Sequence, residues 1–268
     1  MLWLTKNKFL KFLSHGIGFG FVVALAGVIS SDALAQPASA VDWSGFYAAG
    51  FVGGTNSQSQ VKTATGVLQY FNATDAGQIA RIGNNDLDQW RPAGGLAGGY
   101  GKQFGNIVVG IEASANTLFL DEDHMVRQEI DSLPGSQMTI RQSVKADWMA
   151  TVRPRLGWAE DNWLAYVTGG IAATRLTLDT LYTDNAFTGY SKGSKSTFVA
   201  GWSLGLGGEY ALGQGWSLRG EYLYTRFEKI KSVSDVTSTN NSGGTLVHSA
   251  DLDIHGLFIG AVYRFKSF

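Results

Sequence analysis

The sequence of 268 residues has no cysteine, only four prolines and few charged side chains, 16% of the total. Without cysteine no disulfide can form, which suits an exported protein that needs no disulfide staples. Lysine plus arginine (21) and aspartate plus glutamate (22) almost cancel, and the absence of a basic stripe argues against nucleic-acid binding. Beyond the first 35 residues no segment is apolar for long enough to form a transmembrane helix. If the mature chain lies in a membrane, it must cross as the strands of a closed barrel.

The N-terminus has the pattern of a cleaved secretory signal peptide. Three lysines precede an apolar run at 16–29, and "ALA" at 33–35 offers small residues for cleavage. We predict that residues 1–35 are removed and that 36–268 form the mature domain, with cleavage after Ala40 as a second possibility. A membrane-anchoring helix is the alternative, but the run is shorter than the roughly 20 residues that a span needs.

The mature sequence is dominated by a period of two. In the stretch 201–224, "GWSLGLGGEYALGQGWSLRGEYLY", large apolar residues alternate with serine, glycine, glutamate and arginine. This period is typical of strands with one apolar and one polar face. A soluble barrel would turn the apolar face inward, whereas a membrane barrel would turn it toward lipid. Eight such segments occur: 44–54, 91–103, 107–119, 143–160, 163–176, two within 201–227, and 251–265.

The connections between these segments decide between the two barrels. Short turns at 104–106, 161–162 and 213–215 alternate with four longer polar segments, so all the long connections meet at one end. That is the plan of an outer-membrane barrel, with short periplasmic turns and long outer loops. We therefore predict an all-β fold, an eight-stranded antiparallel up-and-down transmembrane β-barrel with four long extracellular loops, of which 55–89 is the longest.

Aromatic residues and one proline refine the prediction. Aromatic side chains gather at both ends of the predicted strands, as in the girdles at the two membrane interfaces. Those beside the short turns and the C-terminus are Trp158, Trp163, Tyr210, Trp216, Tyr263 and Phe265, and those toward the long loops are Trp90, Trp148, Phe198, Trp202 and Tyr224.

Pro154 falls in mid-strand, where it removes a ladder hydrogen bond, so we predict a local bulge there. For the first strand, the sequence leaves open whether Phe46 or Tyr47 points outward.

Charged residues on the polar register are predicted to fill the barrel interior. They are Glu112, Arg153, Arg155, Glu209, Arg219 and Glu221. On the lipid face each arginine near the midplane would cost about 2–4 kcal/mol, whereas inside a narrow barrel these groups can pair. If Gln214 is the centre of its turn, Glu209 lies directly opposite Arg219. Two interpretations follow: a structural network that plugs the interior, or a gate in a narrow channel.

The motifs that carry these features resemble a known family. They include "WSGFYAAG", "VGIEAS", "VRPRLGWA", "GWSLGLGGEYAL" and a closing "GLFIGAVYRF", and they span 43–265 in the family's order. The chain resembles the small eight-stranded outer-membrane β-barrels of Gram-negative bacteria (OmpA-like membrane domains), in the alphaproteobacterial porin-like and outer-membrane immunogenic branch. In this family a terminal aromatic marks the last strand for the barrel-assembly machinery. Here Phe265 lies on the apolar register and Phe268 on the opposite one, so either could serve.

The resemblance implies location in the outer membrane, a role in envelope integrity and surface loops that act as antigens or adhesive surfaces. The expected partners are outer-membrane lipid and lipopolysaccharide, the assembly machinery, and host or surface ligands at the loops. We predict no enzyme activity, no catalytic residues, no cofactor and no metal site. The alternatives are a narrow porin-like channel, a lipid A-modifying enzyme using His255 with Asp253 and Ser249, and haem or metal capture by His124, within "DEDHM" at 121–125, and His248.

Overall fold

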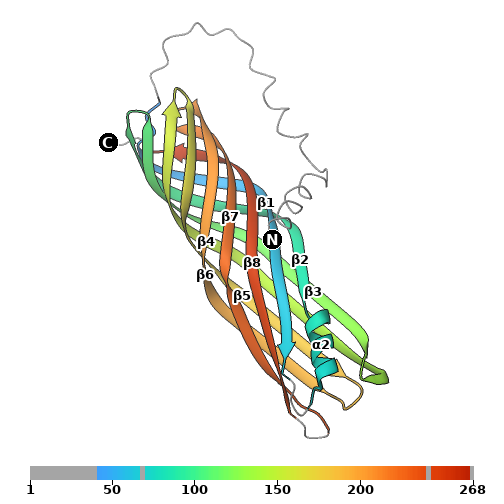
Figure 1. Ribbon diagram of the computed structural model, residues 1–268. Helices are drawn as coiled ribbons and strands as arrows, with labels where there is room; N and C mark the ends of the chain where they lie inside the picture. The colour runs from blue at the N-terminus through green and yellow to red at the C-terminus, as the bar shows by residue number, and fades with distance from the viewer. Residues whose placement is uncertain (1–40, 67–69, 240–242, 266–268) are drawn as a thin grey trace, which may run out of the picture. The chain divides into compact units, whose positions relative to one another are not determined.

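Eight antiparallel strands form a closed barrel in the computed structural model, which describes residues 41–66, 70–239 and 243–265 (Figure 1). Each strand pairs with its neighbours in sequence, and β1 pairs with β8, as the sequence predicts. The strands are β1 (Gly45–Thr65), β2 (Asn85–Phe104), β3 (Ile107–Ile130), β4 (Leu133–Glu160), β5 (Trp163–Asp184), β6 (Tyr190–Gly213), β7 (Trp216–Val236) and β8 (Gly244–Arg264). The predicted signal peptide, residues 1–35, lies outside the described residues, as does Phe268.

The half of the barrel beside the short turns has an apolar outer face. Phe46, Leu96, Ile171 and Leu257 are 64–71% exposed on that face. The neighbour of Phe46, Tyr47, is only 4% exposed and points inward, which settles the register of the first strand. We call this part of the barrel the short-turn half. Its outward surface suits lipid, because apolar side chains that contact lipid are not exposed to water.

The other half of the barrel, which we call the α2 half, has the opposite polarity. In β5 the inward residues Leu176 and Leu178 are fully buried, while Arg175 on the opposite register is exposed. The strands have 20–28 residues, roughly twice the 10 or so that cross a bilayer. The prediction of four long loops is therefore wrong. Most of the polar segments continue as strands, because polar residues can face water on the outside while apolar residues pack inside.

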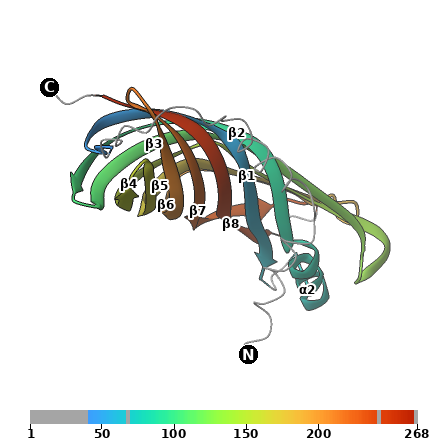
Figure 2. The ribbon, with the colours of Figure 1, turned by 90° about the horizontal axis from the view of Figure 1, so that it is seen from above.

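One of the four connections contains a helix, α2 (Ala73–Ile82), which was not predicted from the sequence. Asn72 caps its N-terminus by accepting a 2.9 Å hydrogen bond from the Asp75 amide. Both views place α2 between the end of β1 and the β3–β4 hairpin (Figures 1 and 2). The Gln78 side chain donates to the Glu129 carbonyl at 2.6 Å, which ties the helix to β3. No helix in the described ranges is long and apolar enough to cross a membrane.

The pairing of β2 with β3 stops halfway along these strands. Its last pair is Gly95 with Asn116, and continuing that register would place Pro92 opposite Phe119. Proline has no amide hydrogen to donate, and Phe119 has a left-handed φ of 50°, so neither residue can extend the ladder. The β3–β4 hairpin is consequently joined to the rest of this end through β5, through α2 and through side-chain bonds such as that from Gln142 to Thr63.

Pro154 does not produce the predicted bulge. The β4–β5 register is the same before and after it, although the ladder skips Arg153 and Pro154. The Thr168 hydroxyl donates to the Pro154 carbonyl at 2.8 Å and replaces the ladder hydrogen bond that this carbonyl lacks. The register shift in β4 lies earlier, between Lys145 and Met149. The prediction failed because a proline can lie in a continuous strand. The nitrogen of Pro154 has no hydrogen to donate, and it faces a part of β5 where the ladder has no pairs.

The predicted aromatic residues lie on the outer face near both edges of the apolar surface. Rings from neighbouring strands pack together beside the short turns, with centroids 4.7 Å apart for Trp163 and Tyr210 and 5.0 Å apart for Trp216 and Tyr263. At the other edge Trp202 and Tyr224 pack at 5.3 Å. These pairs fit the level of the bilayer interfaces, where amphipathic rings are favoured.

The close approach of β4 and β5 near Pro154 gives a testable expectation. A Cβ added at Gly170 would overlap the Val152 carbonyl oxygen, so Gly170→Ala should reduce the free energy of unfolding by about 1–3 kcal/mol. Gly220→Ala is the matched control, because no atom lies within 4 Å of its added Cβ. Urea unfolding in lipid vesicles, followed by tryptophan fluorescence, measures both. Equal stability of the two variants would contradict the proposed strand contact.

Candidate functional site in the barrel interior

The six charged residues predicted for the interior meet inside the short-turn half. They are Glu112 on β3, Arg153 and Arg155 on β4, Glu209 on β6, and Arg219 and Glu221 on β7. All of them are buried, with at most 7% of each residue exposed. Cross-strand pairing places Glu209 opposite Arg219, as predicted from the turn. We call this group the interior charge network.

The charge network joins strands that are not neighbours. Arg153 donates from Nη2 to Glu112 at 2.9 Å and from Nη1 to Glu221 on β7 at 2.8 Å. Arg219 binds Glu209 through Nε at 2.7 Å and Glu112 on β3 through Nη1 at 2.5 Å. The guanidinium groups thus connect β4 with β7 and β7 with β3 across the interior. Such charge-assisted bonds satisfy groups that would be very costly if left buried and unpaired.

Two tyrosines that were not predicted from the sequence complete the network. The Tyr47 hydroxyl donates to Glu112 at 2.9 Å, and the Tyr166 hydroxyl donates to Glu221 at 2.6 Å. Each ring lies over a glycine on the adjacent strand, Gly99 for Tyr47. Gly207 has the same place beside Tyr166, and a Cβ there would overlap the phenol. The arrangement of tyrosine, glycine and glutamate on three successive strands therefore occurs twice, on β1–β3 and on β5–β7.

Arg264 and Trp43 close the network toward the short-turn end, and both were missed from the sequence. Arg264 Nη2 lies 3.7 Å from Glu209, and its guanidinium carbon lies 4.9 Å from the centroid of Trp43. Trp43 is fully buried and packs with Val108 and Leu164. Arg264 follows the inward register between Tyr263 and Phe265, and these two apolar rings dominate the pattern of the last strand.

Above the charge network the interior is an apolar core. Its members are Val61, Leu87, Ala93, Leu118, Leu120, Val144, Ala146, Met149, Ala172, Leu176, Leu178, Val199, Leu223, Phe227, Ile230, Ala250, Leu252, Ile254 and Phe258. A cavity between this core and the charge network, lined by Phe51, Arg153 and Glu221 among others, has a volume of about 10 Å³. That is at the lower limit for a single water molecule. The interior of the described barrel is therefore filled at this level.

A polar layer lies above the apolar core. Gln142 is fully buried and donates to the Thr63 hydroxyl at 2.6 Å, and the same hydroxyl lies 2.8 Å from His248 Nδ1. Burial lowers the pKa of His248 to about 4, so the ring is neutral at pH 7. His124 on β3 is the half-buried ladder partner of Gln142. Among the described residues, no group of three His, Cys, Asp or Glu side chains could hold a metal ion.

The residues of the enzyme alternative have other partners. The Tyr222 hydroxyl lies 2.7 Å from His255 Nδ1, and the ring of Tyr224 packs on the same histidine at 4.9 Å. Asp253 faces Arg226, with 3.5 Å between Oδ1 and Nε. Ser249 is six residues away along the extended strand, too far to act with His255. The geometry therefore assembles no nucleophile–histidine–carboxylate site there.

The fold agrees with the comparison to known proteins. The model of the outer membrane protein beta-barrel domain matches residues 21–265. The chain belongs to this family. It is an outer-membrane β-barrel protein, as the sequence motifs predicted.

Relatives within this barrel family include the 31 kDa outer-membrane immunogenic proteins of Brucella melitensis and Brucella suis. Each is 30% identical over 247 residues, which cover 90% of this chain and 92% of the relative. Among solved structures, the barrel is similar to OprG of Pseudomonas aeruginosa (14% identity, 84% of this chain and 97% of that one, TM-score 0.44). It is also similar to the neisserial surface protein A (11% identity, 83% and 98%, TM-score 0.37).

The charge network yields a prediction about the stability of this family member. Arg219→Met removes the partner that Glu112 and Glu209 share, and leaves buried carboxylates undercompensated. We expect the variant to lose about 3–5 kcal/mol of unfolding free energy. Arg226→Met is the control, because its exposed ion pair with Asp253 is worth at most about 1 kcal/mol. Urea unfolding in vesicles measures the difference, and equal losses in the two variants would contradict a stabilising network.

Proposed function

We propose that this protein is a non-conducting structural barrel that contributes to the integrity of the outer membrane and presents its α2 half outside the cell. One observation carries the proposal: the interior is filled along its length by successive layers. Trp43 and its neighbours close the short-turn end, and the charge network, apolar core and polar layer follow. A barrel of eight strands has just enough interior for its own side chains.

The filled interior argues against the diffusion channel. A solute would have to break buried ion pairs such as Arg153–Glu112 and then displace fully buried leucines such as Leu176 and Leu252. The two obstacles differ in chemistry, so neither a charged nor an apolar solute can pass both at low cost. The barrel is better suited to a structural role in the outer membrane.

The outward surface supports the proposed orientation and partners. The apolar band with its aromatic edges fits contact with membrane lipid, and barrels of this kind place their short turns in the periplasm. Lipopolysaccharide would then surround the level of Trp202 and Tyr224, and the α2 half would reach beyond it. Phe265 is 49% exposed on the lipid-facing register, which suits recognition of the last strand by the assembly machinery. Host or surface ligands would meet the α2 end.

Conductance measurements test the non-conducting interior. We expect the folded wild-type protein to be silent in a planar bilayer, and the double variant Arg153→Ala, Arg155→Ala to remain silent because the apolar core still blocks the passage. Heat-modifiable gel mobility verifies folding of both proteins. Steady conductance of the wild type would establish the channel instead, and conductance of the variant alone would make the charge network the barrier.

A cell experiment tests envelope integrity and surface presentation together. Because the chain has no cysteine, single cysteines can be labelled selectively. Cells that lack the protein should become sensitive to detergent and EDTA, and Val233→Cys, at a site 63% exposed on β7, should restore resistance. The same cysteine should react with a membrane-impermeant maleimide on intact cells.

Asn106→Cys, at a short turn, is the control for orientation and should react only after the outer membrane is permeabilised. Labelling of Asn106→Cys on intact cells would contradict the orientation. Unchanged detergent resistance in cells without the protein would contradict the role in envelope integrity.

A further inference from the structure

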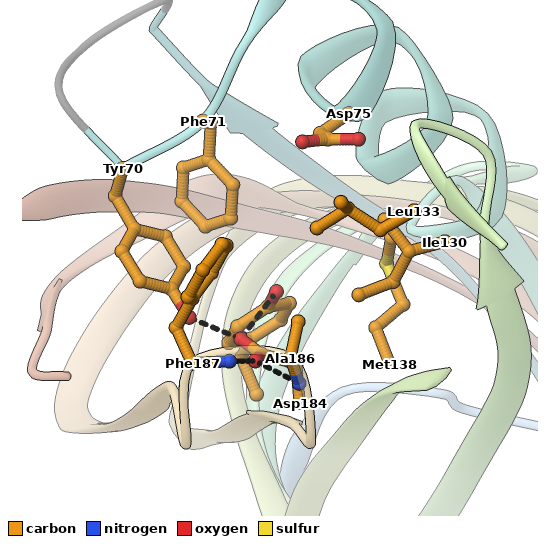
Figure 3. Close-up of a pocket in the computed structure, with 10 residues that line it drawn as sticks. Tyr70, Phe71, Asp75, Ile130, Leu133, Met138, Asp184, Ala186 and Phe187 are labelled. Atoms are coloured by element: carbon orange, nitrogen blue, oxygen red, sulfur yellow. Dashed lines mark hydrogen bonds between the residues drawn. The ribbon is translucent and has the colours of Figure 1, made fainter. Parts of the chain in front are cut away.

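A small cavity at the α2 end combines aromatic rings with two carboxylates. Its volume is about 20 Å³, enough for one water-sized group. It is lined by Tyr70, Phe71, Asp75, Ile130, Leu133, Met138, Tyr182, Asp184, Ala186 and Phe187. Figure 3 shows Tyr70 and Phe71 on one side of the cavity, and Ile130, Leu133 and Met138 on the other. The lining residues come from three segments of the chain, 70–75, 130–138 and 182–187, that meet only in the folded protein.

Asp184 forms the floor of the cavity and is held rigidly. Its Oδ2 accepts hydrogen bonds from the hydroxyls of Tyr70 and Tyr182, the latter at 3.0 Å. Its Oδ1 accepts from the amides of Ala186 and Phe187, both at 3.0 Å. Burial, together with the neighbouring carboxylate, raises the pKa of Tyr70 far above its usual value, so this tyrosine remains a neutral donor. These hydrogen bonds fix the carboxylate in position.

Asp75 supplies a second carboxylate that the fold leaves incompletely satisfied. The residue is only 8% exposed, and its Oδ1 is buried without a hydrogen-bond partner. A place in the first turn of α2 explains why an acidic residue is favoured there. It does not explain a buried oxygen without a donor, since such groups are nearly always paired in proteins.

The two carboxylates have no cation of their own. The nearby Arg81 is paired with Asp131 at 2.9 Å, and in the described ranges neither Asp75 nor Asp184 forms a salt bridge. The charge of Asp75 also acts on the hydroxyls of Tyr70 and Tyr182, which shows that it lies within electrostatic reach of the cavity floor. Two negative charges beside one apolar cavity favour a positively charged occupant.

We infer that this cavity binds the ammonium group of a ligand or partner. The carboxylate Oδ1 of Asp75 accepts one of its hydrogens, Asp184 adds negative charge, and the rings of Tyr70, Phe71 and Phe187 line the cavity around the cation. A primary ammonium is close to water in size and fits the volume. A metal ion fits less well, because no group of three acidic or histidine side chains in the described residues surrounds it.

Two sources carry this chemistry: a lysine side chain of a polypeptide and the amine of an ethanolamine headgroup. The inference rests on the proposed function in one respect, namely that the α2 end faces outward. Binding is measured on the purified full-length protein in detergent micelles, so its outcome does not depend on envelope phenotype or orientation. The probes are N-acetyl-lysine methylamide and phosphoethanolamine, and ligand-observed NMR measures their dissociation constants.

The expected result is saturable binding of an ammonium probe to the wild type, and binding at least about tenfold weaker to Asp75→Asn. N-acetyl-lysine methylamide acetylated on its side chain has the same shape without the charge and should not bind. Asp131→Asn is the matched control, because it removes an exposed carboxylate at the same end without touching the cavity. Tighter binding of the lysine probe would identify a polypeptide partner, and tighter binding of phosphoethanolamine would identify a headgroup.

Three results would overturn the inference: no saturable binding of either probe, unchanged binding to Asp75→Asn, or equal binding of the acetylated probe. Asp75→Asn preserves the shape of the side chain, and heat-modifiable mobility verifies its barrel. Phe187→Leu is a second variant, because it removes one ring from an exposed position without altering α2. It should weaken binding less than Asp75→Asn does, since an exposed cation–π contact is weaker than a buried charge-assisted bond.

Discussion

The medium around the barrel changes halfway along every strand, and the rest of the structure follows from that change. Lipid surrounds the short-turn half, so the outward residues are apolar and polar groups must find partners inside. Water surrounds the α2 half, so the outward residues are polar and apolar residues form an ordinary core. Within β5 alone, Val167 and Ile171 face outward while Leu176 and Leu178 face inward. One period of two therefore serves two opposite patterns, and the apolar register switches from one face to the other.

The charge network is the counterpart of this constraint in the lipid-facing part. Arginine and glutamate occupy the interior there because the apolar residues are needed outside, and burial makes complete pairing necessary. The fold meets this need with the same arrangement of side chains on β1–β3 and on β5–β7. A tyrosine on one strand crosses a glycine and donates to a glutamate on the next, as in Tyr47–Glu112 and Tyr166–Glu221. The arginines of β4 and β7 then join the two arrangements, so the strands of the barrel resist separation.

The sequence predicted the fold, the lipid-facing register and the six charged residues, because these depend on alternation within single strands. Arg153 and Glu209 could be placed from parity and turn length alone. The α2 half was not predicted, because its polar outer face has the composition of loops and only the inward leucines, such as Leu176 and Leu178, indicate strands. Tyr47 was missed for another reason. It is apolar enough to face lipid, and only the glycine opposite it, Gly99, reveals that the ring turns inward.

Apart from two register shifts beside turns, at 129–130 and 211–213, the irregularities of the sheet lie where the two media meet, and the reason is physical. The register shifts at 117–120 in β3, at 145–149 in β4 and at 227–230 in β7, and the β2–β3 pairing ends at Gly95. In lipid an unpaired backbone group has no partner, whereas at the aqueous boundary water can bind it. The gap at Pro154 lies within the lipid-facing part, and there the Thr168 side chain binds the carbonyl that the ladder leaves free. The bulge in β4 leaves Asp147 and Trp148 both outward, one suited to water and one to the interface, and so marks the level at which the surrounding medium changes.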